Sequence, residues 1–551
     1  MISKYHFIRI EATGGAAALF AFVALWYTYK LRKNQRDDNE ENSDDLPYDP
    51  EIHSIGKRGL SVYKKRVPYW DGFMNCLKYP FEKETNPEGY IALCLAENNL
   101  IQEELATRLM REGTAMSAFS ESEAYCLQGF LGLPRAREAL SSFLTRRFWV
   151  KEQKWLGAAP LHHVDSQTVS LESLGRDSHS SQIQSFSPKS TSVIHHDHIA
   201  LGAGIHSLLS HLLYILCDAG DIILIPAPYY TGFDYAIKAI AQCVPFPVNM
   251  ENPLAGPTQK DLDRSYLKAR KRGKRVRVLL LTNPNDPLGI VCSPDTIKSI
   301  ISWARKMKLH VIVDEVFALT AHSNPPSNFQ SIIRVLNNEM GNDVHQLWGL
   351  SKDFGASGFR IGTLYSQNTD LLHALANLNI FSGVSHPMQM ILTELLYDDD
   401  FVDTFLDKSR EKLKRSYDLV TRKLDEMVIP YVSAQAGLFV YVDFSSLLPE
   451  PTFEGEAMFS KLTQEVARLV LTPGQFQNDS KPGMFRLCYS WVPIETLDIA
   501  MERLSYLVLQ IRRSNRWDDL LQGSWKDEIT KVGTSLASRR STVNLSDMGY
   551  R

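Results

Sequence analysis

Three nearly uninterrupted apolar runs in the middle of the chain constrain its fold more than any other feature. They are rich in β-branched residues and span 222–226, 276–282 and 310–313. Stretches between them, such as 294–308, have the periodicity of crossover helices. Such runs are typical of parallel strands, because helices cover both faces of a parallel sheet. The sequence therefore predicts an α/β fold with a mostly parallel central sheet.

Polar residues stand directly after these runs. Asp314 ends the run 310–313, and Asn283 follows the run 276–282. Ligands of open α/β sheets bind at the carboxyl ends of the strands, so we expect the functional site there. A partly desolvated carboxylate such as Asp314 is costly unless a cation pairs with it. The alternative is that Asp314 caps a helix or a turn.

Length and charge limit the remaining possibilities. A chain of 551 residues is too long for one compact core, which indicates several domains or a two-lobed enzyme with extensions. The net charge of -3 gives no long-range field that would attract nucleic acid. Seven cysteines without CxxC spacing argue against a disulfide framework and a structural zinc, and they indicate a reducing compartment.

The N-terminus differs in composition from the rest of the chain. Residues 12–29 are uncharged, rich in Ala, Leu and Phe, and long enough for a transmembrane helix. The heavier basic cluster follows this run, so a single-pass anchor would leave the catalytic domain facing the cytosol. A cleaved signal peptide, which lacks its small-residue site here, and an organelle presequence are the alternatives. We therefore expect a membrane anchor in 1–36 and an acidic linker in 37–50.

The body of the protein is expected in residues 51–513. Its large domain would cover about 120–380 and its small domain would come from both flanks. A polar insertion at 156–198 contains six histidines, but no cysteine or carboxylate spacing completes a ligand set. A polar loop is favoured over a metal site, so no metal is expected. The composition of 514–551 predicts a disordered tail.

Several short motifs contain the residues that pyridoxal 5'-phosphate (PLP) requires. This cofactor needs a lysine for a Schiff base, an acid for its ring nitrogen, phosphate donors and a stacking partner. The segment 350–355 contains Lys352, and Arg360 follows eight positions later within 358–362. The segments 283–289 and 228–234 complete the set. Taken alone, a lysine in such a loop is more often a surface residue.

With these motifs in this order, the chain resembles the class I/II aminotransferases of fold type I. Within them it is most similar to the 1-aminocyclopropane-1-carboxylate (ACC) synthase branch. The stretches that carry this similarity are 86–90, 95–100, 132–134 and 228–230. The resemblance covers about residues 79–509 apart from the insertion. It implies a PLP-dependent homodimer with active sites at the subunit interface.

The resemblance also implies roles for individual residues. Lys352 would form the internal aldimine and move a proton, Asp314 would hold the proton of the ring nitrogen, and Tyr230 would stack on the ring. These three are the expected catalytic residues. The further cofactor-binding residues would be Arg360, Ser351, Asp286 and the backbone around Gly204, Ile205 and His206 at a helix start.

The implied substrate site contains one arginine. Arg486 would bind the α-carboxylate of an amino acid through two parallel hydrogen bonds. Glu97 and Asn98 would line the pocket. The alternative for Arg486 is an ordinary surface salt bridge. No second arginine identifies the substrate side chain.

Four positions depart from the family pattern. Phe317 replaces a tyrosine and Asp286 an asparagine, both of which donate to O3' of the ring in the family. Phe130 and Gly349 replace a tyrosine and a serine that bind phosphate, the tyrosine from the partner subunit. Each lost phosphate donor weakens cofactor binding by roughly 1–3 kcal/mol. An ionised Asp286 also requires a cation that the sequence does not identify.

Three functions are compatible with this sequence. The first is an enzyme that transaminates or otherwise processes an α-amino acid. The second is a PLP-binding pseudoenzyme that acts as a scaffold, which the four departures favour. The third is ACC synthase, a lyase, which is disfavoured because Phe130 removes a tyrosine of that pocket.

Overall fold

The computed structural model describes residues 69–111, 113–149, 193–322 and 329–513, with the short pieces 55–56 and 58–59. The chain divides into two compact units, 1–66 and 67–551, and the fold below is that of the second. The expected anchor, linker and tail lie outside the described residues, as does most of the expected insertion.

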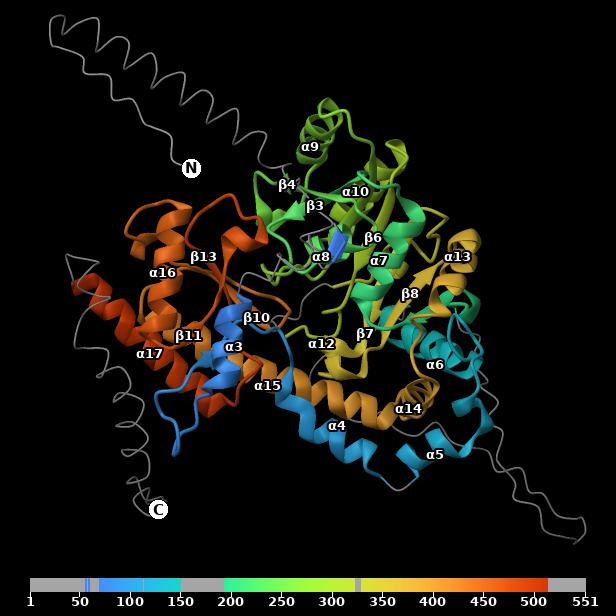
Figure 1. Ribbon diagram of the computed structural model, residues 1–551, viewed down its shortest axis with the longest axis horizontal. Coiled ribbons are helices and arrows are strands. Elements are labelled where there is room, and N and C mark those ends of the chain that lie inside the picture. The colour runs from blue at the N-terminus through green and yellow to red at the C-terminus, as the bar shows by residue number, and fades with distance from the viewer. Residues whose placement is uncertain are drawn as a thin grey trace, which may run out of the picture. The chain divides into compact units, whose positions relative to one another are not determined.

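The main sheet of the described body has seven strands (Figure 1). Its order is β2-β8-β7-β6-β5-β3-β4. The strands are β2 (Ile199–Gly202), β3 (Ile222–Ala227), β4 (Val244–Asn249), β5 (Val276–Thr282), β6 (His310–Asp314), β7 (Val344–Gly349) and β8 (Gly362–Ser366). All neighbouring pairs from β7 to β4 are parallel, and only β8 pairs antiparallel, with β7 and β2. The predicted mostly parallel sheet is confirmed.

Helices bury both faces of this sheet. Alternate residues of one strand belong to different cores: Leu279 packs in one apolar cluster and Leu280 in the other. The helices in this part of the body are α6 (Pro134–Leu144), α7 (Ile205–Leu216), α8 (Phe233–Ala239), α9 (Gln259–Lys271), α10 (Pro294–Lys306), α11 (Ile332–Val335), α12 (Leu350–Asp353) and α13 (Thr369–Asn379). Helix α10 agrees with the predicted crossover helix and begins at Ser293, whose hydroxyl accepts from the backbone N–H of Thr296.

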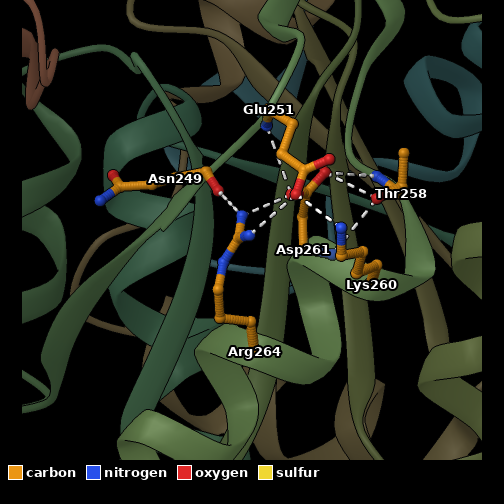
Figure 2. Close-up of polar contacts among 6 residues, drawn as sticks. All are labelled: Asn249, Glu251, Thr258, Lys260, Asp261 and Arg264. Carbon is orange, nitrogen blue, oxygen red and sulfur yellow. Dashed lines mark hydrogen bonds and ion pairs between the residues drawn. The ribbon is translucent and has the colours of Figure 1, made fainter.

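Helix α9 is fixed to β4 by a set of polar contacts (Figure 2). Thr258 and Asp261 form a capping box at its start. Arg264, one turn further, donates to the carbonyl of Asn249 at 2.7 Å and to Asp261 at 2.5 Å. Lys260 pairs with Glu251 at 2.9 Å. These contacts satisfy the helix start and hold α9 beside the end of β4.

The described body also contains a smaller antiparallel sheet. Its order is β12-β13-β10-β9. Its strands are β9 (Tyr431–Val432), β10 (Phe439–Asp443), β12 (Thr472–Pro473) and β13 (Met484–Cys488), and its helices are α16 (Phe453–Glu465) and α17 (Ile494–Arg513). Near it, β1 (Ile91–Ala92) pairs in parallel with β11 (Leu469–Val470). Residues from the two ends of the described body are thus joined by strand pairing.

The described body contains five further α-helices. They are α3 (Trp70–Lys78), α4 (Gln102–Leu109), α5 (Thr114–Ser120), α14 (His386–Tyr397) and α15 (Asp399–Glu426). Helix α15 has 28 residues, and the side chain of Asp398 caps its start by accepting from the N–H of Phe401. In Figure 1 it runs from beside α14 toward α17. The division into a large domain and a small domain from both flanks stays a prediction.

The prediction of a single-pass membrane protein facing the cytosol is corrected. Among the helices in the described part of the chain, none is both long enough and apolar enough to cross a bilayer. The physical reason is clear in the longest of them, α15, which carries charged residues along its whole length. The segment 12–29, on which the prediction depended, lies outside the described residues.

Candidate active site

The expected cofactor lysine and its acid follow neighbouring strands of the large sheet. Asp314 is the last residue of β6, and Lys352 lies in α12 directly after β7. Because β6 and β7 are parallel, with Asp314 opposite Leu347, both side chains lie at the same edge of the sheet. This is the edge at which α/β sheets bind ligands.

Lys352 is held by the backbone of a distant segment. Its Nζ donates to the carbonyl of Ala96 at 2.7 Å. Burial lowers the pKa of Lys352, while the carboxylates of Glu97 and Asp286 oppose that shift. A lower pKa leaves more of the amine unprotonated near neutral pH, which favours nucleophilic attack on a carbonyl.

Asp314 is a buried carboxyl that has no ion-pair partner in the described part of the chain. It is 5% exposed, and its Oδ1 accepts from the N–H of Val316 at 3.1 Å. Burial raises the pKa of Asp314 to about 7, Asp286 adds to that effect, and Lys352 opposes it. A carboxyl in this state is suited to pair with a protonated ring nitrogen, which would supply the missing cation.

A set of anion-binding groups gathers at the start of α7. Arg360 lies in the left-handed region, with φ 54°, and its Nη1 donates to the carbonyl of Ser357 at 2.8 Å. A Cβ at Gly204 would lie 2.4 Å from Nη2 of Arg360, so a larger residue there would push the guanidinium away from the helix start. A helix N-terminus together with a guanidinium fits a phosphate group.

The other predicted cofactor residues surround this point. Ile205 is the first residue of α7, and the ring of His206 meets that of Tyr230 edge-on at 5.5 Å. Desolvation, followed by the charges of Lys352 and Arg360, lowers the pKa of His206 to about 4. The carbonyl of Ser351 accepts from the hydroxyl of Ser357 at 3.0 Å.

Tyr230 remains an un-ionised phenol in this environment. Burial raises the pKa of Tyr230 to about 12, while Arg486 opposes that shift. A Cβ at Gly232 would lie 2.3 Å from the Tyr230 ring, so this glycine allows the ring to lie against the backbone. The ring thereby lies close enough to Asp286 and Asp314 for their charges to act on its hydroxyl.

The cation that Asp286 requires is Arg486. Nη1 of Arg486 lies 2.8 Å from both carboxylate oxygens of Asp286, and both side chains are buried. Nη2 donates to the carbonyl of Cys94 at 3.0 Å, and the guanidinium lies over the Phe439 ring. Arg486 is therefore in a buried ion pair, and the alternative of a surface salt bridge is wrong.

Glu97 and Asn98 differ in how they relate to this site. The carboxylate of Glu97 acts electrostatically on Lys352 and Tyr230. Asn98 is fully buried, and its amide donates to Ser409 of α15 at 3.0 Å. The Asn98 side chain therefore contacts α15, and no described contact joins it to Lys352 or Arg486.

The other departures from the family pattern are accommodated by packing. Phe317 is buried and meets the ring of Phe439 edge-on at 5.3 Å. A Cβ at Gly349 would lie 2.8 Å from the carbonyl oxygen of Ile361, so a larger residue requires a shift there. Phe130 is 40% exposed and lines a surface cavity of about 360 Å³.

Sequence reasoning missed several groups that complete the site. The carbonyls of Cys94 and Ala96 bind Arg486 and Lys352, and a backbone group has no signature in the sequence. Tyr69 lies near Tyr230 and Arg486, and burial raises its pKa, with Tyr230 as the next contribution. Gln477 donates weakly to Asp286 at 3.4 Å. Neither side chain belongs to a motif that could have identified it.

These residues fit PLP. The described chain offers a buried lysine amine, an acid at a strand end, and a guanidinium beside a helix start. Lys352 would bind the aldehyde carbon, Asp314 would hold the ring nitrogen, and Arg360 with the start of α7 would bind the phosphate. When bound, the cofactor supplies an electron sink for carbanion chemistry.

Comparison with known proteins agrees with this geometry. The family described as aminotransferase class I and II matches residues 170–504. ACC synthase 1 of Oryza sativa subsp. indica is 32% identical over 88% of this chain and 91% of its own length. A "probable inactive" ACC synthase-like protein 2 of Mus musculus is 27% identical over 84% of this chain and 73% of its own length.

Solved structures show the same fold. The aspartate aminotransferase of Thermus thermophilus with maleate has a TM-score of 0.63 and 18% identity, covering 83% of this chain and all of its own. An archaeal alanine:glyoxylate aminotransferase gives a TM-score of 0.64 at 18% identity, covering 83% of this chain and 98% of its own. The resemblance seen in the motifs is confirmed. The chain belongs to the aminotransferase class I and II family, whose cofactor is pyridoxal 5'-phosphate.

Proposed function

We propose that this chain is a PLP-dependent enzyme that processes the amino group of an α-amino acid with Lys352 as its catalytic lysine. The observation that carries the proposal is the position of Lys352, one turn after β7 and at the same sheet edge as Asp314. The lowered pKa of Lys352 supports it, since catalysis requires an amine that can give up its proton.

Each residue would have a limited task. Lys352 would bind the cofactor aldehyde and then carry a proton to or from the substrate carbon. Asp314 would keep the ring nitrogen protonated. Tyr230 would hold the ring against one face of the site. Arg360 and the N–H groups at the start of α7 would bind the phosphate and thereby fix the ring relative to Lys352.

Borohydride reduction followed by peptide mapping tests the role of Lys352. Purified protein with PLP should absorb in the visible and should be labelled at Lys352. Lys352→Ala should abolish the visible band. Lys412 is a matched control, because it too is part-buried and donates to a carbonyl, that of Leu100 at 2.8 Å. Lys412→Ala should keep the band, and labelling of any other lysine in the native protein would contradict the proposal.

The proposal leaves two reaction types open, transamination and the lyase reaction of ACC synthases. A panel of amino acids, each with and without an α-keto acid acceptor, separates them, since only transamination consumes the acceptor. The replacement of a family tyrosine by Phe130 disfavours the lyase reaction.

A second candidate function is PLP binding without turnover. Phe317 and Gly349 favour it, because the first offers no hydroxyl and the second has no side chain. The mouse relative, whose name calls it a "probable inactive" protein, points the same way. A protein that shows the visible band but whose spectrum no amino acid alters would support this candidate and reject the enzyme.

We also propose that the chain forms a homodimer. Large apolar side chains are exposed around the cavity at Phe130, on α5 and on the segment after α13. They are Met116 (78%), Phe119 (55%), Tyr125 (73%), Leu127 (72%) and Phe381 (89%). Such a surface is typical of an interface. Light scattering should give the mass of two chains, and Phe381→Asp should lower it, whereas a monomeric native protein would exclude the dimer.

A further inference from the structure

The Asp286–Arg486 pair occupies the place where the proposed function requires a free arginine. Both partners are almost fully buried, at 3% and 1% exposure. Arg486 extends from β13, between Thr472 of β12 and Tyr441 of β10. Asp286 lies 200 residues earlier, in the loop after β5. The contact is therefore a feature of the tertiary fold and not of a local turn.

We propose that Asp286 is a specificity-determining residue that holds Arg486 from within the protein and so weakens the binding of a ligand carboxylate. The proposal rests on the proposed function, because it takes Lys352 as the point where an amine reacts. Its consequence is a site that gains little from an α-carboxylate. Such a site distinguishes poorly between an α-amino acid and the amine that lacks the carboxylate.

The hydrogen-bond donors of Arg486 support this inference. Nη1 faces both oxygens of Asp286, and Nη2 is engaged by the carbonyl of Cys94. Nε is buried and has no acceptor in the described part of the chain. A ligand carboxylate must therefore either displace Asp286 or lie beside it on the remaining edge of the guanidinium. In the second case two carboxylates share one cation, and their repulsion opposes binding.

The electrostatic surroundings of Lys352 point in the same direction. Glu97 and Asp286 both raise the pKa of Lys352, so two carboxylates act on the reactive amine. An approaching ammonium group is attracted by these charges, whereas an approaching carboxylate is repelled by them. With Arg486 neutralised, no second described cation faces Asp286 across an ion-pair distance.

Asp286→Asn tests the proposal, because asparagine has the same shape without the charge. The PLP-loaded protein is titrated calorimetrically with matched pairs, L-alanine with ethylamine and L-phenylalanine with 2-phenylethylamine, without any amino-group acceptor. The variant should bind each amino acid at least about tenfold more tightly than the native protein does. Its affinity for each amine should stay within about threefold of the native affinity. Unchanged amino-acid binding, or an equal gain for amine and amino acid, would overturn the proposal.

Glu97→Gln provides the matched control. Glu97 is the other carboxylate that acts on Lys352, but no ion pair joins it to Arg486 in the described residues. Its loss should change the affinities for an amine and its amino acid by a similar factor. A selective gain for the amino acid equal to that of Asp286→Asn would show that general charge, not the pair, limits carboxylate binding.

A double variant covers the case in which Asp286→Asn does not fold, since a buried arginine without its partner is destabilising. Asp286→Asn with Arg486→Gln removes both charges. The proposal expects the native ratio of amino-acid to amine affinity within about threefold, because Arg486 contributes little to carboxylate binding in the native protein. A selective loss of about tenfold for amino acids would show that Arg486 already binds the carboxylate, and would overturn it.

A different experiment decides the proposed function. If Lys352→Ala keeps the visible band, the assignment of the cofactor lysine is wrong. The calorimetric comparison still decides the role of Asp286, since it measures binding and not turnover.

Discussion

At the scale of single residues, the site depends on positions where only one side chain fits. Gly204 is one of them, because its φ is +88° and a Cβ would meet Arg360. Asp314 is another, because it is buried and ionisable at the end of a strand. Asp314 thus places the cost of a buried polar group where a ligand would relieve it.

Gly204→Ala should weaken PLP binding by about tenfold or more, because the new methyl group displaces Arg360 from the start of α7. Gly273→Ala is the control, since Gly273 also has a positive φ of +72° but no atom within 4 Å of the added Cβ. The affinity of the Gly273→Ala variant for PLP should equal that of the native protein. Fluorescence titration with PLP measures both, and equal losses in the two variants would assign the effect to backbone strain.

The contribution of Asp314 to the stability of the cofactor-free protein should fall as pH rises from about 4 to about 7. The pKa of Asp314 rises from 3.8 in the unfolded chain to about 7 in the fold, so the folded carboxyl keeps its proton while the unfolded one loses it. The slope for one such group is about 1.4 kcal/mol per pH unit. Glu315, whose pKa also rises to about 7, adds a slope of the same sign.

Asp314→Asn should remove this contribution, so the free energy of unfolding of the variant should fall less, or rise more, with pH than that of the native protein. Urea unfolding at pH 5, 6 and 7 measures the free energy of unfolding in each protein. A variant that retains the full native slope would show that Asp314 does not hold its proton in the fold.

At the scale of elements, the sequence predicts best the strands that are buried on both faces of the sheet. The run 276–282 coincides with β5, and the runs 222–226 and 310–313 each end one residue before β3 and β6 end. These strands are covered on both faces, so their sequences have a continuous apolar signal. Strands β12 and β11 have two residues each, which is too short for any periodicity.

The same reasoning explains what sequence could say about the site. Motifs placed Lys352, Asp314 and Arg360 because each follows a recognisable local segment. The need of Asp286 for a cation was evident from its chemistry, but its partner depends on the pairing of β10 with β13. Contacts made by the carbonyls of Cys94 and Ala96 involve no side chain, and no residue pattern encodes them.

Helix α17 fixes the segment 86–90 through one arginine. Arg503 is fully buried and donates to the carbonyls of Gly89 and Pro87 at 2.9 and 2.6 Å. Arg503→Ala should lower the free energy of unfolding by about 2–4 kcal/mol, because it leaves two carbonyls without donors and a cavity behind. Arg512→Ala, on the exposed end of α17, should cost less than about 1 kcal/mol in the same guanidinium unfolding experiment. Equal costs would contradict this role.

At the scale of the whole molecule, the described body joins residues from both of its ends. The compact unit begins at Val67, and β1 pairs with β11 more than two-thirds of the chain later. A chain that begins at Val67 should therefore fold and bind PLP. A chain that begins at Asn99 should not, because it lacks β1 and both carbonyls that hold Lys352 and Arg486. Circular dichroism and the visible band measure the two outcomes, and cofactor binding by the shorter chain would contradict them.

The pairing of β1 with β11 also determines when the site can be completed during synthesis. Tyr90 and Arg468, which contact each other beside this pair, are 378 residues apart. A ribosome adds about 5–20 residues per second, so the N-terminal segment exists for roughly 20–80 s before its partner strand does. Contacts between such distant residues also form late, because a long loop must close first. The nascent chain therefore presents Lys352 before the segment that holds it can dock, and cofactor capture has to wait until almost the entire body has been made.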